Sequence, residues 1–380
     1  MREYAFVYPG GRGMHRPVAF KNRDEISDFL IKKLPIHCYY STAYYTNPEV
    51  PMADKEWLGA DLVFDLDADH LPGGAELSYT KQMELVKKKT QLLIDDFLLG
   101  DFGFKPEETS LNFSGHRGYH IHVRNKDVIS MSKNARRELV DYITATGLDY
   151  DELLPSTIHK IDEFMGHIKS VTSYGLPPEE AGGWMRRIRS LIIDLLNRWD
   201  TMPKEDVLKE MEEKANIAGK RSERLYGELF VSNKWKKIAK EGNLDCLSEK
   251  QGASQKWLLS ILDGILDEHN IREVGDGVVG TTDEPVTGDT KRLIRLPMSI
   301  HGGSFLTVIP IELDRFDEFD PLSEAVPTSL SKEEISLKLD HIPDPDVIVL
   351  KNQEFKLEEE MSVPEYAAPF IISKFRAKVL

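Results

Sequence analysis

The stretch DLVFDLDADH, residues 61–70, carries the pattern that decides the fold. Its apolar and polar residues alternate with a period of two, which is typical of a half-buried β-strand. Asp65 and Asp67 therefore share one face of that strand. Their side chains start roughly 6 to 7 Å apart, so both carboxylates can bind the same one or two divalent cations. Since paired acids on an apolar strand are unfavourable without a compensating charge, the sequence predicts a metal-binding platform.

An Asp-x-Asp pair alone does not identify a function, because the same pattern has a structural explanation. Aspartates at the end of a strand often bond to nearby backbone groups in a turn. Similar pairs also occur in nucleotidyl transferases, glycosyltransferases, phosphatases and nucleases. The rest of the chain has to decide between these alternatives.

Composition indicates a globular protein with an acidic balance. The chain has 380 residues, 41% of them hydrophobic, and a formal net charge of −15. That charge argues against a protein that holds nucleic acid mainly by diffuse attraction, which requires clustered Lys and Arg. Cys38 and Cys246 lie far apart, and the N-terminus lacks an apolar signal segment, so we expect free thiols in the cytoplasm. No apolar run in the sequence reaches the length of a membrane-spanning helix.

The second informative stretch is SGHRGYHIHV, residues 114–123. Its two glycines predict a tight hairpin turn, because glycine accepts the positive φ that such turns require. In the strand that follows, His120 and His122 share one face. Arg117 suits bidentate contacts to phosphate, and histidine can also donate to phosphate oxygens. Structural histidines, or a His-x-His metal site, are the competing interpretations.

The third informative stretch is DEPVTGDTKRLIRLPMSIHGG, residues 283–303. Its charged residues surround a short strand-like segment: Asp283, Asp289, Arg292, Arg295 and His301. These groups can simply neutralise one another as ion pairs. If a carboxylate from this stretch instead meets Asp65 and Asp67, the site would have three acids for two metal ions and a cationic wall for a triphosphate.

Periodicity outlines the remaining elements. It predicts strands within residues 2–6 and 37–45, and helices over 23–33 and 80–98. The region from about 155 to 270 is almost wholly helical in pattern. A strand over 305–313, an acidic linker to about 351 and an amphipathic helix over 366–380 complete the chain. The tyrosines of HCYYSTAYY (37–45) can stack on a base, but we expect them to pack against the sheet.

Together these stretches resemble the small, catalytic subunit of archaeal DNA primase, a member of the archaeo-eukaryotic primase superfamily. The motifs that carry the resemblance occur in one order: REYAF, HCYYSTAYY, DLVFDLDADH, SGHRGYHIHV, and DEPVT with RLIRLP and SIHGG. The resemblance implies a template-directed nucleotidyl transferase that makes short RNA primers, and in this family often DNA primers, on single-stranded DNA. Its substrates would be NTPs or dNTPs, and its partner a primase large subunit in a heterodimer.

The resemblance also implies an α/β, or α+β, fold. We expect a catalytic domain with mixed β-sheets flanked by helices, formed by residues 1–160 and 271–345. A mainly helical subdomain would be inserted over 161–270. The C-terminal segment, residues 346–380, would pack on the catalytic domain.

The resemblance places the site residues on specific positions. The metal ligands fall on Asp65, Asp67 and Asp283, which would hold two Mg²⁺ or Mn²⁺ ions. The nucleotide-binding residues fall on Ser114, Arg117, His120, Arg292, Arg295 and His301. Many relatives carry a basic residue where this chain has His116, and a Lys where it has Gly303, so those two phosphate contacts are in question. Residues 70–100 contain no Cys, so we expect no zinc knuckle there.

Two alternatives from other functional classes remain open at this point. The same acids would serve a related repair polymerase or a metal-dependent nuclease. A non-catalytic nucleic-acid-binding subunit would need none of them.

Overall fold

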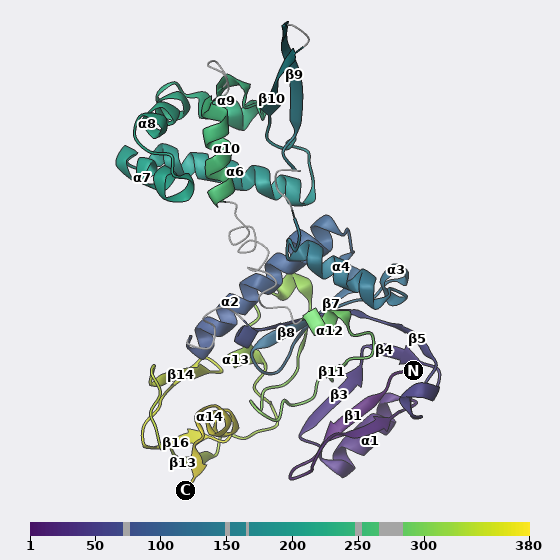
Figure 1. Ribbon diagram of the computed structural model, residues 1–380. Coiled ribbons are helices and arrows are strands. Elements are labelled where there is room, and N and C mark those ends of the chain that lie inside the picture. The colour runs from purple at the N-terminus through teal and green to yellow at the C-terminus, as the bar shows by residue number, and fades with distance from the viewer. Residues whose placement is uncertain (71–76, 149–152, 165–166, 248–252, 266–283) are drawn as a thin grey trace. The chain divides into compact units, whose positions relative to one another are not determined.

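The structure of the protein is a computed structural model (Figure 1). It describes residues 1–70, 77–148, 153–164, 167–247, 253–265 and 284–380. The chain divides into two compact units, one formed by Met1–Thr144 with Asp276–Leu380 and the other by Ala145–Gly275. Helices and several small antiparallel sheets occur together, which confirms the predicted α+β class. Among the described residues, every helix is too short or too polar to span a lipid bilayer.

A four-stranded antiparallel sheet in the first unit joins the N-terminus to the third informative stretch. Its strands lie in the order β11 (Leu293–Arg295), β3 (His37–Ser41), β1 (Tyr4–Val7) and β2 (His15–Val18). Helix α1 (Arg23–Lys33) follows β2, and Phe29 on it packs against the ring of Phe6 at 4.7 Å. Because β11 pairs with β3, Arg295 lies opposite Tyr39 across the sheet.

A second four-stranded antiparallel sheet contains the acidic strand. Its order is β12 (Pro310–Ile311), β7 (Thr109–Phe113), β8 (Gly118–Val123) and β6 (Leu62–Asp67). The apolar residues of β6 are fully buried, as the period-two pattern predicts. Helix α2 (Tyr79–Leu92) contacts β6 and β8, and α12 (Glu284–Gly288) contacts β6 and α4 (Lys133–Ile143), as Figure 1 shows.

The rest of the first unit is built from short elements. These are β4 (Ala43–Tyr45), β5 (Trp57–Ala60), α3 (Lys126–Ile129), α13 (Pro321–Glu324), β13 (Glu334–Lys338), β14 (Val347–Leu350), β15 (Gln353–Lys356), β16 (Glu360–Pro364), α14 (Ala368–Phe375) and β17 (Lys378–Val379). The expected linker to about residue 351 is therefore wrong, because α13, β13 and β14 lie within it. The predicted C-terminal helix ends early, since Arg376 adopts a left-handed conformation and the next residues pair with β13.

The strand predicted over 305–313 is also mostly wrong. Residues Met298 and Phe305 adopt positive φ angles of 65° and 59°. The backbone N–H of Phe305 donates to the carbonyl oxygen of His301 at 2.8 Å, and that of His301 to Leu306 at 2.8 Å. These bonds close a tight turn, so that only β12 joins the sheet.

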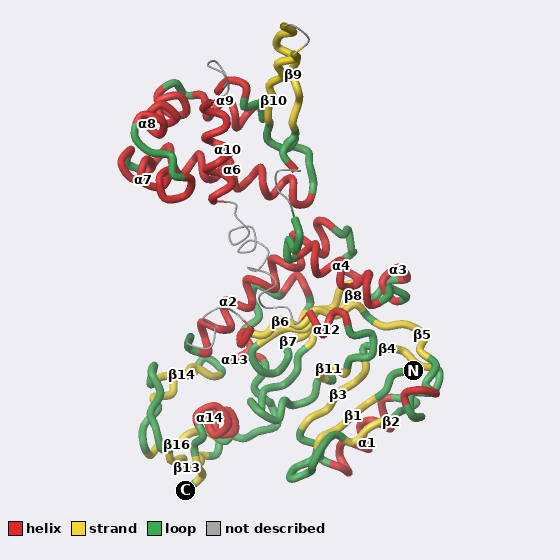
Figure 2. Tube along the Cα trace, in the orientation of Figure 1, coloured by secondary structure: helices red, strands yellow, loops and turns green. Residues whose placement is uncertain are grey.

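The second unit combines helices with one β-hairpin. The helices are α6 (Gly183–Thr201), α7 (Lys204–Ala215), α8 (Lys220–Tyr226), α9 (Lys234–Glu241) and α10 (Ala253–Ile265). Strands β9 (Ser156–Phe164) and β10 (His167–Tyr174) form the hairpin, drawn in yellow in Figure 2. The prediction of an almost wholly helical region is therefore wrong at its start. The hairpin contains an irregular register next to Lys169, which interrupts the alternation that identifies a strand.

Candidate active site

The two carboxylates of β6 lie at its C-terminal end, on one face. Asp65 pairs with His120 of β8, and Asp67 pairs with Gly118. The side chain of Asp65 is 27% exposed, and its Oδ1 lies 3.4 Å from Nε2 of His120. Gly118 is required here, because a Cβ atom at this position would lie 2.0 Å from the carbonyl oxygen of Leu66. The close approach of β6 and β8 thus fixes the backbone from which both carboxylates project.

The predicted hairpin turn between β7 and β8 is confirmed. Gly115 has a φ of +81°, and the N–H of Ser114 donates to the carbonyl oxygen of Gly118 at 2.9 Å. The side chain of Ser114 accepts from the N–H of His116 at 3.4 Å. A Cβ on Gly115 would lie 2.9 Å from the Cβ of His301, so the turn fits closely against the SIHGG segment. As a result the rings of His116 and His301 stack in parallel, 5.0 Å apart.

Arg295 of β11 is held between aromatic groups. Its guanidinium lies 4.6 Å from the ring centre of Tyr39. It donates to Nδ1 of His37 at 2.6 Å and to Nε2 of His301 at 2.9 Å. Since both imidazoles accept these bonds, both are neutral. They orient the guanidinium without competing with it for charge.

Burial lowers the pKa values of the imidazoles at this site and so keeps them neutral. Burial and the charge of Arg295 lower the pKa of His301 to about 2 and that of His120 to about 3. Burial and the neighbouring Arg117 lower the pKa of His116 to about 4. The contact between His120 and Asp65 is therefore not an ion pair at neutral pH. The positive charge on this side of the site comes from arginine.

The carboxylates and Arg295 face one polar cavity of about 220 Å³. Most of the predicted site residues line it: Asp65, Asp67, Ser114, His120, Arg292, Arg295 and His301. Arg117 does not line this cavity and instead pairs with Asp69. Asp283 lies outside the described residues.

The roles of two residues at the site, His37 and Tyr39, were missed in the sequence. His37 and Tyr39 contact Arg295, and Tyr39 also lines the cavity with His116. The tyrosine prediction holds for Tyr40 and Tyr45, which are buried. The signal for Tyr39 was present in the alternation of β3, which places His37 and Tyr39 on the face opposite Tyr40.

The donors at this cavity fit a hard divalent cation. Asp65 and Asp67 supply carboxylate oxygens from one strand face. Among the described residues, no group of three or more His, Cys, Asp or Glu side chains converges to hold a metal. Two carboxylates nevertheless suffice for Mg²⁺, which usually binds one or two of them and completes its shell with waters and substrate phosphates.

The neighbouring histidine, His122, belongs to a structural network. Its Nδ1 lies 3.2 Å from Asp61, and its ring stacks on Tyr40 at 6.0 Å. Arg2 and Arg124 also donate to Asp61. Although burial raises the pKa of Asp61, the hydrogen bond with His122 and the charges of Arg2 and Arg124 hold it well below the usual range. His120 and His122 thus share a face of β8 but lie in different environments.

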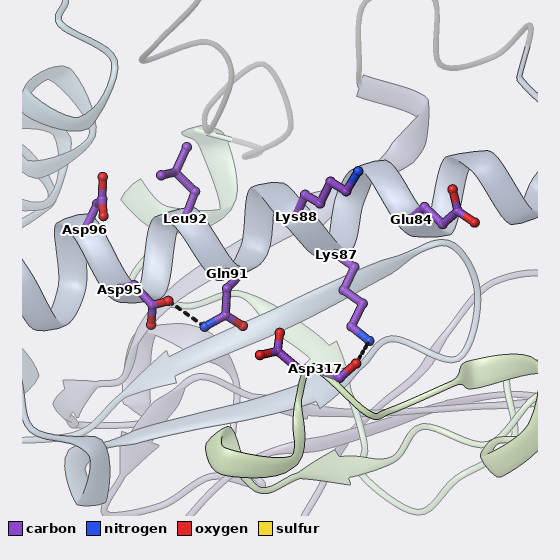
Figure 3. Close-up of a pocket in the computed structure, with 8 residues that line it drawn as sticks. All are labelled: Glu84, Lys87, Lys88, Gln91, Leu92, Asp95, Asp96 and Asp317. Carbon is purple, nitrogen blue, oxygen red and sulfur yellow. Dashed lines mark hydrogen bonds between the residues drawn. The ribbon is translucent and has the colours of Figure 1, made fainter. Parts of the chain in front are cut away.

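A larger cavity of about 500 Å³ lies along α2 (Figure 3). Charged and polar side chains surround it: Glu84, Lys87, Lys88, Gln91, Asp95, Asp96 and Asp317, together with Leu92. Lys87 donates to the carbonyl oxygen of Asp317 at 2.7 Å, and Gln91 to Asp95 at 2.6 Å. None of the predicted site residues lines this cavity, so the smaller cavity is the candidate active site.

Comparison with known proteins identifies the family. The family model for the DNA primase small subunit matches residues 64–313. A protein named DNA primase small subunit PriS from Methanothrix thermoacetophila is 38% identical, and the alignment covers 100% of this chain and 92% of the relative. Proteins with the same name from Methanocella arvoryzae and Methanococcoides burtonii are 35% and 36% identical, over 98% and 96% of this chain and 91% and 88% of the relatives.

Proposed function

Since the chain belongs to the family of DNA primase small subunits, we propose that this DNA-directed primase carries out nucleotidyl transfer in the cavity of Asp65, Asp67 and Arg295. The reaction joins nucleotides on a single-stranded DNA template to make a primer for replication. One observation carries the assignment: carboxylates from β6 and an arginine from β11, far apart in sequence, face the same cavity. Phosphoryl transfer depends mainly on such positioning and charge stabilisation.

Asp65 and Asp67 hold the divalent cations in this proposal. Two Mg²⁺ or Mn²⁺ ions bound there would lower the pKa of the attacking 3′-hydroxyl and stabilise the leaving pyrophosphate. The pairing of β6 with β8 places both residues on one face of the strand, and Gly118 allows the two strands to approach closely.

Asp283 is the proposed third carboxylate. Val286, three residues further along the chain, lines the cavity. Three residues span at most about 11 Å, and this short separation along the chain supports a role for Asp283 beside Asp65 and Asp67. We expect Asp283→Asn to abolish primer synthesis. Asp289→Asn should retain it, because the carboxylate of Asp289 accepts a hydrogen bond from the N–H of Lys291 at 2.8 Å, which is a local turn contact. The opposite result would transfer the role to Asp289.

The phosphates of the incoming nucleotide would contact the cationic wall. Arg295 can exchange its two imidazole acceptors for phosphate oxygens, which are stronger acceptors because they are charged. The released His301 could then donate an N–H to the same phosphates. His120, Arg292 and Ser114 line the same cavity and would bind the remaining oxygens.

A large subunit is the proposed partner in a heterodimer. The net charge of −15 leaves this chain with few means of holding a template through its phosphates before a duplex exists. The relatives are named small subunits, which supports a second chain that shares this task. We propose that both NTPs and dNTPs enter the site, as the family resemblance implies.

A primer-synthesis assay on unprimed single-stranded DNA tests the function. Labelled NTPs or dNTPs are added with Mg²⁺ or Mn²⁺, with and without the large subunit, and the products are separated by length. We expect short primers made de novo. Extension of pre-annealed primers alone would indicate a repair polymerase, degradation of a labelled template would indicate a nuclease, and either would overturn the proposal.

A further inference from the structure

The C-terminal helix α14 packs beside the turn that carries His301. The hydroxyl of Ser373 donates to the carbonyl oxygen of Gly303. The ring of Phe370 meets the ring of Tyr79, at the start of α2, edge-on at 5.4 Å. Both contacts lie within the first unit. They place the next residue of α14, Lys374, beside the hairpin turn between β7 and β8.

Lys374 has no anionic partner in the described part of the chain. Its ammonium lies 4.8 Å from the ring centre of Tyr79, which is the contact that holds it. Burial and the charge of Arg117 lower the pKa of Lys374, although Asp69 opposes this. Asp69 already pairs with Arg117, so it is not available to Lys374 as an ion-pair partner. Lys374 is therefore the cation here that lacks an ion pair among the described residues.

Arg117 also has an unused donor. Its Nε is buried and has no hydrogen-bond partner among the described residues. Arg117 and Lys374 line a second polar cavity of about 230 Å³, which also borders on the start of α2 and on the segment before β14. The one acid that lines this cavity, Asp344, forms no ion pair with either cation.

The second cavity is adjacent to the active-site cavity. His116 lines the first cavity and its chain neighbour Arg117 lines the second. Lys374 is close enough to His116 for its charge to lower the pKa of that imidazole, although burial is the main cause. The SIHGG turn offers no cation of its own at Gly303, which has no side chain.

We propose that Lys374 joins Arg117, which the family resemblance already assigns to nucleotide binding, in a phosphate subsite that extends the active site and binds the triphosphate of the incoming nucleotide. This inference rests on the proposed function, because the same nucleotide would contact Arg295 and His301. A phosphate oxygen placed between the two cations would accept from the unused Nε of Arg117 and from the ammonium of Lys374. The C-terminal segment would then contribute directly to substrate binding, through α14.

Calorimetric titration of the full chain with inorganic triphosphate tests the subsite. We expect Lys374→Gln to weaken binding about tenfold, which corresponds to one charge-assisted hydrogen bond. Lys374→Met, which keeps the length of the side chain against Tyr79, should weaken binding equally, whereas Lys374→Arg should stay within about threefold of the parent. Lys356→Gln is the control, because Lys356 is 65% exposed and pairs with Glu358. Thermal unfolding of each variant checks that it folds.

Two results would overturn the inference. One is triphosphate binding by the Gln and Met variants that equals binding by the parent. The other is unchanged triphosphate binding together with weaker binding of a single-stranded oligonucleotide, which would make Lys374 a template contact. Failure of the proposed function is distinct, because then the parent chain itself would neither bind triphosphate nor synthesise primers.

Discussion

At the scale of single residues, the site combines two carboxylates on one strand face with a guanidinium that hydrogen-bonds to neutral imidazoles. The arrangement depends on burial, which keeps His301 and His120 uncharged close to Arg295. A protonated imidazole at either position would repel the guanidinium and compete for the carboxylates. The low pKa values therefore follow from packing and in turn determine the polarity of the site.

Arg295 should not be replaceable by lysine. Lysine cannot donate in two directions from one plane, and it stacks less well on Tyr39. We expect Arg295→Lys to reduce kcat/KM for NTPs by about 10- to 100-fold. Steady-state primer synthesis measures this, with Arg315→Lys as the matched control, since Arg315 is 61% exposed and pairs with Glu324. Equal losses in the two variants would contradict a specific role for Arg295.

The buried His120 predicts a dependence of stability on pH. Its pKa is lowered to about 3 in the folded state, below the value of about 6.5 in the unfolded chain. The unfolded state therefore binds more protons between these values, so the contribution of His120 is full above pH 6.5 and is lost as the pH falls toward 3. Urea unfolding at pH 7 and pH 5, with EDTA present, should show a smaller loss of stability for His120→Gln than for the parent. An equal pH dependence in both proteins would refute this.

At the scale of elements, the β6–β8 pair and its turn were predictable, because strand alternation and glycine placement are local signals. The partners of Arg295 were not, since they depend on the pairing of β11 with β3, more than 250 residues apart in the chain. The β9–β10 hairpin was missed for a local reason. The register shifts beside Lys169, where β9 contains one extra residue. Ile158 and Ile161 are therefore three positions apart in the sequence, which is a helical spacing and not the alternation of a regular strand.

The close approach of β6 and β8 makes Gly118 the most sensitive glycine at the site. In Gly118→Ala, the new Cβ would meet the backbone of Leu66, which cannot rotate away. We expect a loss of about 2 kcal/mol or more in the free energy of unfolding, from strain in a packed sheet. Gly288→Ala is the control, because its Cβ would meet only the side chain of Lys133 at 3.9 Å. Denaturant unfolding of both variants measures the difference. Equal free energies of unfolding for Gly118→Ala and Gly288→Ala would contradict the prediction and show that the sheet can relax.

At the scale of the whole molecule, the proposed catalytic residues that the structure describes all lie in the first unit. The sequence predicted the order of the motifs but not that the C-terminal helix α14 reaches the turn of His301. That contact joins segments about 70 residues apart, and no periodic pattern in the sequence predicts it. The proposed boundaries of the inserted subdomain, 161–270, remain a prediction.

Two compact units should give two unfolding transitions. Trp184, Trp199, Trp235 and Trp257 lie in the second unit and only Trp57 lies in the first, so tryptophan fluorescence follows mainly the second. Calorimetry records the unfolding transitions of both units. We expect Mn²⁺ to raise the midpoint of the first unit's transition and leave the fluorescence transition unchanged, because a ligand stabilises the unit that binds it. A single transition that shifts as a whole would argue against independent units.

The carboxylates of β6 are the centre of this account, and their replacement tests it most directly. Primer synthesis on unprimed single-stranded DNA should be abolished in Asp65→Asn and in Asp67→Asn, while Asp289→Asn stays active and all three variants unfold at the temperature of the parent. Near-normal synthesis by either β6 variant would contradict the account, because the cavity would then lack the groups on which the chemistry depends.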